Sequence, residues 1–174
     1  MRQVLDNSRE TMIQLRDDLE ALELYVRLEA MRHKDKFDYD IDVAEDVDQL
    51  DYQVPPLLIH PFVENAIRHG IMNKEGQGNL RVAIRKEAGN QILCVTIEDD
   101  GVGRAKALEL RSANGLHHTS AGMAMTEKRL ALVNEACKTN IRMAVTDLQN
   151  GAGKAAGTRV ELWIPKLNGT FQSP

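Results

Sequence analysis

The stretch P-P-L-L-I-H-P-F-V-E-N-A-I-R-H-G, residues 55–70, joins a proline-led start to apolar residues at helical spacing. Proline is tolerated in the first turn of a helix, where its missing N–H would have no partner. The segment therefore predicts a helix over residues 56–70 with one apolar face. That face would consist of Leu57, Leu58, Phe62, Val63 and Ile67.

A polar edge on this predicted helix is the first candidate for a ligand site. Asn65 offers a neutral oxygen, and Arg68 and His69 follow three and four residues later, on neighbouring helical positions. This combination suits a metal-bound polyphosphate, because Mg²⁺ takes few protein oxygens and leaves its other positions to phosphate and water. An amphipathic helix with a merely polar edge is the competing interpretation, and the rest of the chain has to decide.

Composition narrows the class of protein. The 174 residues, 43% of them hydrophobic, are most simply one domain with an appendage. A balance of 22 basic and 26 acidic residues predicts no general attraction to nucleic acid or to an anionic membrane surface. Cys94 and Cys137 follow no ligand or disulfide pattern, which indicates reduced thiols of a cytoplasmic protein. No apolar run reaches the roughly 20 residues of a membrane span, which leaves open an anchor in a longer parent protein.

The amino-terminal third predicts a helix followed by a strand. Apolar residues at 3-and-4 spacing from Leu5 onward indicate either one long helix or a short helix, a break and a longer helix over about 15–33. Leu24, Tyr25 and Leu28 widen the apolar face of that longer helix. We therefore expect this helix to lie against the domain. Residues 37–43 alternate apolar side chains with three aspartates, as in a half-buried strand whose acidic face meets solvent.

The remainder alternates strands with glycine-rich segments. Strands over 80–87 and 91–98 lead into D-D-G-V-G at 99–103, where two glycines allow close backbone approach and a carboxylate can accept a bond from an amino group. We expect residues 104–121 to form a mobile loop over a site. A helix from Gly122 to about Cys137 would have a start suited to phosphate, and further strands follow.

Four separated segments now occur in one known order, and the chain resembles the GHKL ATPase superfamily, specifically the catalytic ATP-binding domain of LytS-type sensor histidine kinases. The segments are P-F-V-E-N-A-I-R-H-G at 61–70, D-D-G-V-G at 99–103, Gly122 before K-R-L at 128–130, and Gly157-Thr158 before the last strand. The resemblance covers about residues 14–165. It implies an α+β fold, the Bergerat ATP-binding fold: a two-layer α/β sandwich whose mixed sheet is covered on one face by helices. The expected division is a helical connector over 1–33, the end of a dimerisation segment, a kinase domain over 34–167, and a tail over 168–174.

Carried over residue by residue, the resemblance implies a site for ATP and Mg²⁺. Asn65 would coordinate Mg²⁺, Arg68 and His69 would face the phosphates, and Asp99 would accept the adenine amino group. Gly101 and Gly103 would let the chain pass the nucleotide, Gly122 and Met123 would begin the phosphate-facing end of the lid helix, and Thr158 would lie near the base. Glu64 is the nearest carboxylate. It is a candidate catalytic base for an attacking imidazole, with a hydrogen-bonded helix residue as the alternative.

Two departures from the family pattern matter. The second glycine box usually reads G-x-G-L but here reads G-M-A-M, which puts Ala124 where backbone and phosphate come close. No histidine is followed by phenylalanine, as the acceptor histidine of the family commonly is. We therefore expect the acceptor to lie outside these residues and the fragment alone not to phosphorylate itself.

The function implied by the resemblance is the catalytic domain of a two-component sensor histidine kinase. It would transfer the γ-phosphate of ATP to a histidine on a helical phosphoacceptor segment of the same protein, for relay to a response regulator. The full-length protein would be a homodimer and a membrane-anchored sensor with this domain in the cytoplasm; no nucleic acid is expected as a partner. An anti-sigma-factor-type serine kinase and a nucleotide-free dimerisation module are the alternatives. The presence of Asn65, Asp99, Gly101 and Gly103 argues against the last.

Overall fold

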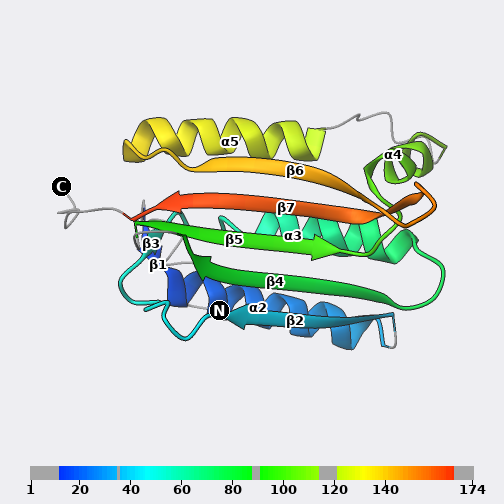
Figure 1. Cartoon of the computed structure of the whole chain (residues 1–174), viewed down its shortest axis with the longest axis horizontal. Helices are drawn as coiled ribbons and strands as arrows, with labels where there is room; N and C mark the ends of the chain where they lie inside the picture. Colours follow the sequence, from blue (N-terminus) through cyan, green and yellow to red (C-terminus); the bar gives the residue numbers. More distant parts are fainter. Residues whose placement is uncertain (1–11, 35, 88–90, 114–120, 167–174) are drawn as a thin grey trace.

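A five-stranded mixed sheet forms the centre of the chain (Figure 1). The computed structural model describes residues 12–34, 36–87, 91–113 and 121–166. The sheet order is β2-β4-β5-β7-β6, with β2 parallel to β4 and the other neighbours antiparallel. Its strands are β2 (Phe37–Val43), β4 (Gly78–Lys86), β5 (Ile92–Asp99), β6 (Arg142–Gln149) and β7 (Ala155–Pro165).

Helices cover one face of this sheet. Alternate residues of the three central strands are buried, because successive side chains of a strand point to opposite faces. The buried set is Leu80, Val82, Ile84, Leu93, Val95, Ile97, Val160, Leu162 and Ile164. These side chains share one hydrophobic core with residues of the helices. The predicted α+β fold, a mixed sheet covered on one face, is confirmed.

The first helix, α2 (Leu15–Arg32), packs against that core. Its buried apolar residues are Leu15, Leu19, Leu22 and Val26. The expectation that this helix lies against the domain is confirmed, and Tyr25 packs against the core as predicted, but the widening of the apolar face is wrong at the two leucines. Leu24 and Leu28 are each 55% exposed, because they lie about 200° around the helix from Leu22 and Val26. Next to this helix, β1 (Ile13–Gln14) and β3 (Gln53–Val54) form a small antiparallel sheet.

The central helical segment begins later than predicted. Helix α3 (His60–Asn65) continues as a π-helical turn, η1 (Ala66–Gly70), and a 3₁₀ turn, η2 (Ile71–Asn73). The predicted start at residue 56 is wrong, because Leu57 adopts a φ of 55° and its N–H is bound by Asp18 of α2. Pro61 takes the first-turn position instead. Leu58, Phe62, Val63 and Ile67 are buried, which confirms most of the predicted apolar face.

The segment after the D-D-G-V-G motif is helical at first. Helix α4 (Arg104–Ala113) replaces the first ten residues of the predicted loop, because R-A-K-A-L-E-L consists largely of strong helix formers. Residues 114–120, which include His117 and His118, lie outside the described residues. Helix α5 (Ala121–Cys137) confirms the helix predicted from Gly122 and places Ala124 in its first turn. Among the described helices, none has the length and apolar character needed to cross a membrane.

Candidate functional site

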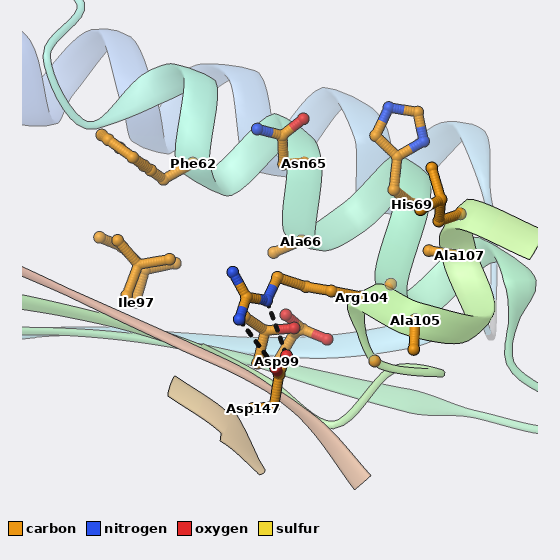
Figure 2. Close-up of a pocket in the computed structure, with 15 residues that line it drawn as sticks. Phe62, Asn65, Ala66, His69, Ile97, Asp99, Arg104, Ala105, Ala107 and Asp147 are labelled. Carbon is orange, nitrogen blue, oxygen red and sulfur yellow. Dashed lines mark hydrogen bonds and ion pairs between the residues drawn. The ribbon is translucent and has the colours of Figure 1, made fainter. Parts of the chain in front are cut away.

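A cavity of about 390 Å³ lies between helix α3 and the sheet (Figure 2). Three parts of the chain line it: α3 with η1, the inward faces of β5, β7 and β6, and the start of α4. The lining residues are Phe62, Asn65, Ala66, His69, Gly70, Ile97, Asp99, Gly103, Arg104, Ala105, Ala107, Leu108, Asp147, Thr158 and Val160. Seven of these residues have apolar side chains, six have polar or charged side chains, and two are glycines. Such a combination is typical of sites for small molecules and cofactors.

A row of polar side chains crosses the sheet at one end of the cavity. Asp99 of β5 pairs in register with Thr158 of β7, and Thr158 pairs with Asp147 of β6. All three line the cavity. Asp99 is only 4% exposed, and its Oδ1 accepts the N–H of Gly101 at 2.9 Å. The strand end therefore places a buried carboxylate and a hydroxyl side by side at the cavity wall.

Glycines make room for Asp99. A Cβ on Gly70 would lie 2.5 Å from Asp99 Oδ1, and one on Gly101 would overlap the backbone of Gly70. Gly157, with a φ of 125°, passes so close to the Asp99 carbonyl that a Cβ there would also overlap it. Larger residues at these positions would displace the carboxylate or the strands. These three glycines thus leave room for Asp99 and restrict it to one position.

Asp99 and Asp100 differ in their surroundings. Asp100 accepts the Asn79 N–H at 2.7 Å and pairs with Lys74 at 2.9 Å. Burial raises the pKa of Asp99 to about 7, although the Gly101 N–H acts in the opposite direction. Asp100 is thus held by protein groups, whereas Asp99 is the acid of this pair that lines the cavity.

The opposite wall is a helical surface with two polar residues. Asn65 and His69 lie one turn apart and both line the cavity, whereas Arg68, the third residue of the predicted polar edge, does not (Figure 2). Glu64 and Arg68 also lie one turn apart, on a neighbouring surface of the helix. They form an ion pair at 2.7 Å, their side chains are 40% and 62% exposed, and neither lines the cavity.

This placement bears on two predicted roles. Arg68 donates to Glu64 instead of facing the cavity, and Glu64 has the arrangement of the alternative interpretation, a hydrogen-bonded helix residue. Their roles toward phosphate and imidazole stay predictions. Gly103, with a φ of 77°, and Thr158 line the cavity, whereas Gly101 lies against Gly70 and Asp99 Oδ1; their roles toward a nucleotide also stay predictions. Gly122 and Met123 belong to the first turn of α5.

Two further lining residues were not predicted. Arg104 and Asp147 form a two-bond ion pair, with both N···O distances at 2.7 Å. No motif connects them, because they are 43 positions apart. The alternation of Ile141, Met143 and Val145 does point to Asp147 as the next inward residue, and this signal could have identified it.

The described residues offer a metal few ligands. Among them, no group of three or more histidine, cysteine or acidic side chains is arranged to hold a metal ion. Asn65, which lines the cavity, carries one amide oxygen. This donor set fits Mg²⁺ that arrives with a polyphosphate, because such an ion keeps water and phosphate oxygens as most of its ligands.

Comparisons with known proteins agree with this geometry. Residues 55–168 match a family model described as histidine kinase-, DNA gyrase B-, and HSP90-like ATPase. The sensor histidine kinase YpdA of Escherichia coli is 29% identical over 134 residues, 76% of this chain and 23% of that protein. The sensor histidine kinase/phosphatase LytS of Staphylococcus aureus is 31% identical over 102 residues, 59% of this chain and 17% of that protein. The chain thus spans less than a quarter of the length of these relatives.

Solved structures show the same fold. The histidine kinase domain of a blue-light activated kinase from Erythrobacter litoralis matches with a TM-score of 0.57 at 17% identity, over 88% of this chain and 62% of that chain. The catalytic domain of the histidine kinase ThkA matches with a TM-score of 0.54 at 13% identity, over 89% of this chain and 95% of that chain. At such identities the likeness concerns the fold alone. Because the family model matches well over half of its residues, the chain belongs to the family of histidine kinase-, DNA gyrase B- and HSP90-like ATPases.

Proposed function

We propose that this domain binds ATP with Mg²⁺ and transfers the γ-phosphate to a histidine on a helical segment outside these residues. The observation that carries the proposal is the placement of Asp99, a buried carboxylate that lines a cavity and is surrounded by three glycines. Asn65 and His69 line the opposite wall of the same cavity. A site with a base acceptor at one wall and an amide and an imidazole at the other suits a nucleotide with its phosphates.

Asp99 would select adenine. Its carboxylate accepts a hydrogen bond from the N6 amino group of adenine, whereas guanine presents a carbonyl at that position. Thr158, the neighbour of Asp99 in the polar row, would lie near the base. A guanine nucleotide would leave the Asp99 carboxylate facing another acceptor, and this should cost roughly 1–3 kcal/mol, about 5- to 150-fold in affinity.

The phosphates would lie along α3 and the start of α5. Asn65 would hold Mg²⁺, and His69 lies one turn further along the same cavity wall. Bound Mg²⁺ neutralises negative charge on the phosphates. The backbone N–H groups of Gly122 and Met123, in the first turn of α5, would donate hydrogen bonds to phosphate oxygens, as N–H groups at helix starts commonly do.

The acceptor imidazole would approach near the Glu64–Arg68 pair. Both side chains are accessible, at 40% and 62% exposure, so a docking segment could reach them. Glu64 would orient the imidazole or take its proton, and Arg68 would turn from Glu64 toward the γ-phosphate. Phosphoryl transfer relies mainly on such positioning and on charge neutralisation.

The complete protein would be a homodimeric sensor that passes the phosphoryl group to a response regulator. We place this domain in the cytoplasm and the sensing part of the protein at a membrane. Two of the relatives carry the name sensor histidine kinase, and this supports the proposal.

The test combines binding with phosphoryl transfer. Calorimetry with Mg²⁺ should show ATP bound about 5- to 150-fold more tightly than GTP. Incubation with ATP should label a helical acceptor segment of the sensor supplied in trans, and should leave the chain itself unlabelled. Equal affinity for ATP and GTP would contradict the role of Asp99. A stable phosphohistidine on any histidine of the chain, detected by mass spectrometry at neutral or alkaline pH, would contradict an external acceptor; these are His33, His60, His69, His117 and His118.

A further inference from the structure

An ion pair at the cavity wall joins the start of α4 to β6. Arg104 Nε donates to Asp147 Oδ1 and Arg104 Nη2 donates to Asp147 Oδ2, both at 2.7 Å. This two-bond arrangement fixes the plane of the guanidinium group. Figure 2 shows the Arg104 side chain extending from α4 toward Asp147, between the helix that carries Asn65 and the strands. The pair is therefore part of the cavity wall.

The register of the sheet places this pair in one row with Asp99, the residue proposed to bind the base. Asp147 stands next to Thr158, and Thr158 stands next to Asp99, on three adjacent strands. Adjacent strands are about 4.8 Å apart, so the row extends roughly 10 Å from Asp99 to Asp147. Asn65, proposed to hold the metal near the phosphates, belongs to the helix on the opposite wall.

The charges of the pair favour a base over a phosphate as its neighbour. The hydrogen bonds between the two groups raise the pKa of Arg104 and lower the pKa of Asp147, so both are charged at neutral pH. Because the carboxylate balances the guanidinium, the pair has little net charge with which to attract phosphate. Its planar guanidinium is nevertheless suited to stacking on an aromatic ring.

We propose that Arg104, held by Asp147, stacks on the purine ring of the bound nucleotide. Arg104 is then a binding residue, and Asp147 is a positioning residue that acts through it. The inference rests on the proposed nucleotide binding and extends it: Asp99 recognises the edge of the base, and Arg104 covers its face.

The test compares variants of the whole chain in the binding of adenosine, ADP and ATP with Mg²⁺. Affinities are measured by displacement of a fluorescent ATP analogue, which also detects weak ligands. Arg104→Met keeps an unbranched apolar side chain and removes the guanidinium. It should weaken all three ligands by the same factor, about 2- to 30-fold. Asp147→Asn should weaken them less, and Asp147→Glu, which keeps the carboxylate, should restore affinity.

A second ion pair in the sheet supplies the matched control. Arg159 of β7 donates to Glu98 of β5 at 2.8 Å, and Arg159 lies between the inward residues Thr158 and Val160, so it points to the face away from the cavity. Arg159→Met makes the same chemical change and should leave all three affinities unchanged. Thermal unfolding without nucleotide should show that the Arg104 and Arg159 variants are folded.

The outcomes separate this inference from the proposed function. A wild-type chain that binds none of the three ligands overturns both. ATP binding by the wild type with unchanged affinities in Arg104→Met overturns the inference alone. A loss confined to ADP and ATP would assign Arg104 to the phosphates, and a gain in affinity would make the pair an obstruction; either result overturns stacking.

Discussion

Asp18 and Asp99 are both almost completely buried, at 2% and 4% exposure, yet the chain surrounds them differently. Asp18 lies on α2, where its Oδ1 accepts the N–H of Leu57 at 2.6 Å. Asp99 accepts one N–H, from Gly101, and lines the cavity. Burial raises the pKa of both acids, to about 6 for Asp18 and about 7 for Asp99. The two acids are similarly buried, but Asp18 is surrounded by protein whereas Asp99 faces the cavity.

The two acids lie near opposite ends of the same helical segment. Asp18 binds the chain just before α3, where the N–H groups of Leu58 and Ile59 also lower its pKa against the effect of burial. Arg129 of α5 donates to the carbonyl of Pro56 at 2.7 Å, so the same short loop also contacts α5. Asp99 lies beside Gly70, where the π-helical turn ends. The comparison indicates that a buried acid fixes the backbone at one end of the segment and faces a cavity at the other.

The largest effect we expect is on the pH dependence of stability. A pKa raised from 3.8 to about 7 means that folded Asp99 holds its proton more tightly than the unfolded chain does. Its contribution is therefore fully present below about pH 4 and is lost as the pH rises through 7, on the order of 4 kcal/mol. For Asp18, with a pKa of about 6, the corresponding loss is on the order of 3 kcal/mol and is complete at lower pH.

Urea unfolding of the nucleotide-free chain at pH 5 and pH 8 checks this expectation. Asp99→Asn has no titrating group at that position, so its stability should fall less than that of the wild type between the two pH values. Asp18→Asn should show a smaller change of the same sign. Identical pH profiles of unfolding free energy for the wild type and Asp99→Asn would contradict the raised pKa of Asp99. The electrostatic part of the comparison between Asp18 and Asp99 would then fail.

The second effect concerns the unfolding free energy and is expected at Asp18 alone. At pH 5, Asp18→Ala leaves the N–H groups before α3 without their acceptor and should lower the unfolding free energy by about 2–4 kcal/mol. This corresponds to roughly 2–4 °C in Tm for each kcal/mol. ATP affinity should stay within about twofold, because Asp18 does not line the cavity. Asp17→Ala, a change at the more exposed neighbour, should cost under about 1 kcal/mol. If Asp18→Ala lowers the free energy of ATP binding by more than it lowers the free energy of unfolding, Asp18 is not a purely structural acid. The proposed difference between Asp18 and Asp99 would then be wrong.

The third effect concerns ATP affinity and is expected at Asp99 alone. Asp99→Asn keeps an oxygen for the Gly101 N–H but loses the carboxylate that would accept the adenine amino group. ATP affinity should fall about 5- to 150-fold, measured by calorimetry, with no loss of stability at pH 8. Asp100→Asn is the matched control, since Asp100 is held by Asn79 and Lys74. Equal losses for the two variants would mean that the effect does not come from a contact with the base.

The sequence was informative where a feature is local. The D-D-G-V-G motif follows a strand with clear alternation, so the position of Asp99 at a strand end could be predicted from neighbouring residues alone. The helical period likewise identified Leu58, Phe62, Val63 and Ile67 as the buried side of the central segment. In these cases the chain supplies both the side chain and the backbone geometry within a few residues.

Features that depend on distant contacts were missed. The start of α3 at His60 depends on Asp18, which is 39 positions from Leu57. The Arg104–Asp147 pair forms only because β6 joins the sheet beside β7. The close approach of Gly70 to Asp99 likewise joins a helical turn to a strand end. Local patterns do not encode which elements meet, and so this part of the site could not be predicted from them.

The smallest expected effect concerns Leu57, whose N–H binds Asp18. It distinguishes the contribution of the Leu57 backbone to stability from that of its side chain. Leu57 has a φ of 55°, which costs an L-residue about 1–2 kcal/mol and costs glycine nothing. Leu57→Gly removes that strain but adds about 0.5–1 kcal/mol of backbone entropy and loses a side chain that is 36% exposed. The Leu57 N–H still reaches Asp18, so these opposing terms should leave stability within about 1 kcal/mol of the wild type in urea unfolding. Leu57→Ala keeps the strain and loses most of the side chain, so it should be less stable than Leu57→Gly. The opposite order of the two variants would mean that the loop relaxes away from this conformation, and that Asp18 does not hold the backbone in place.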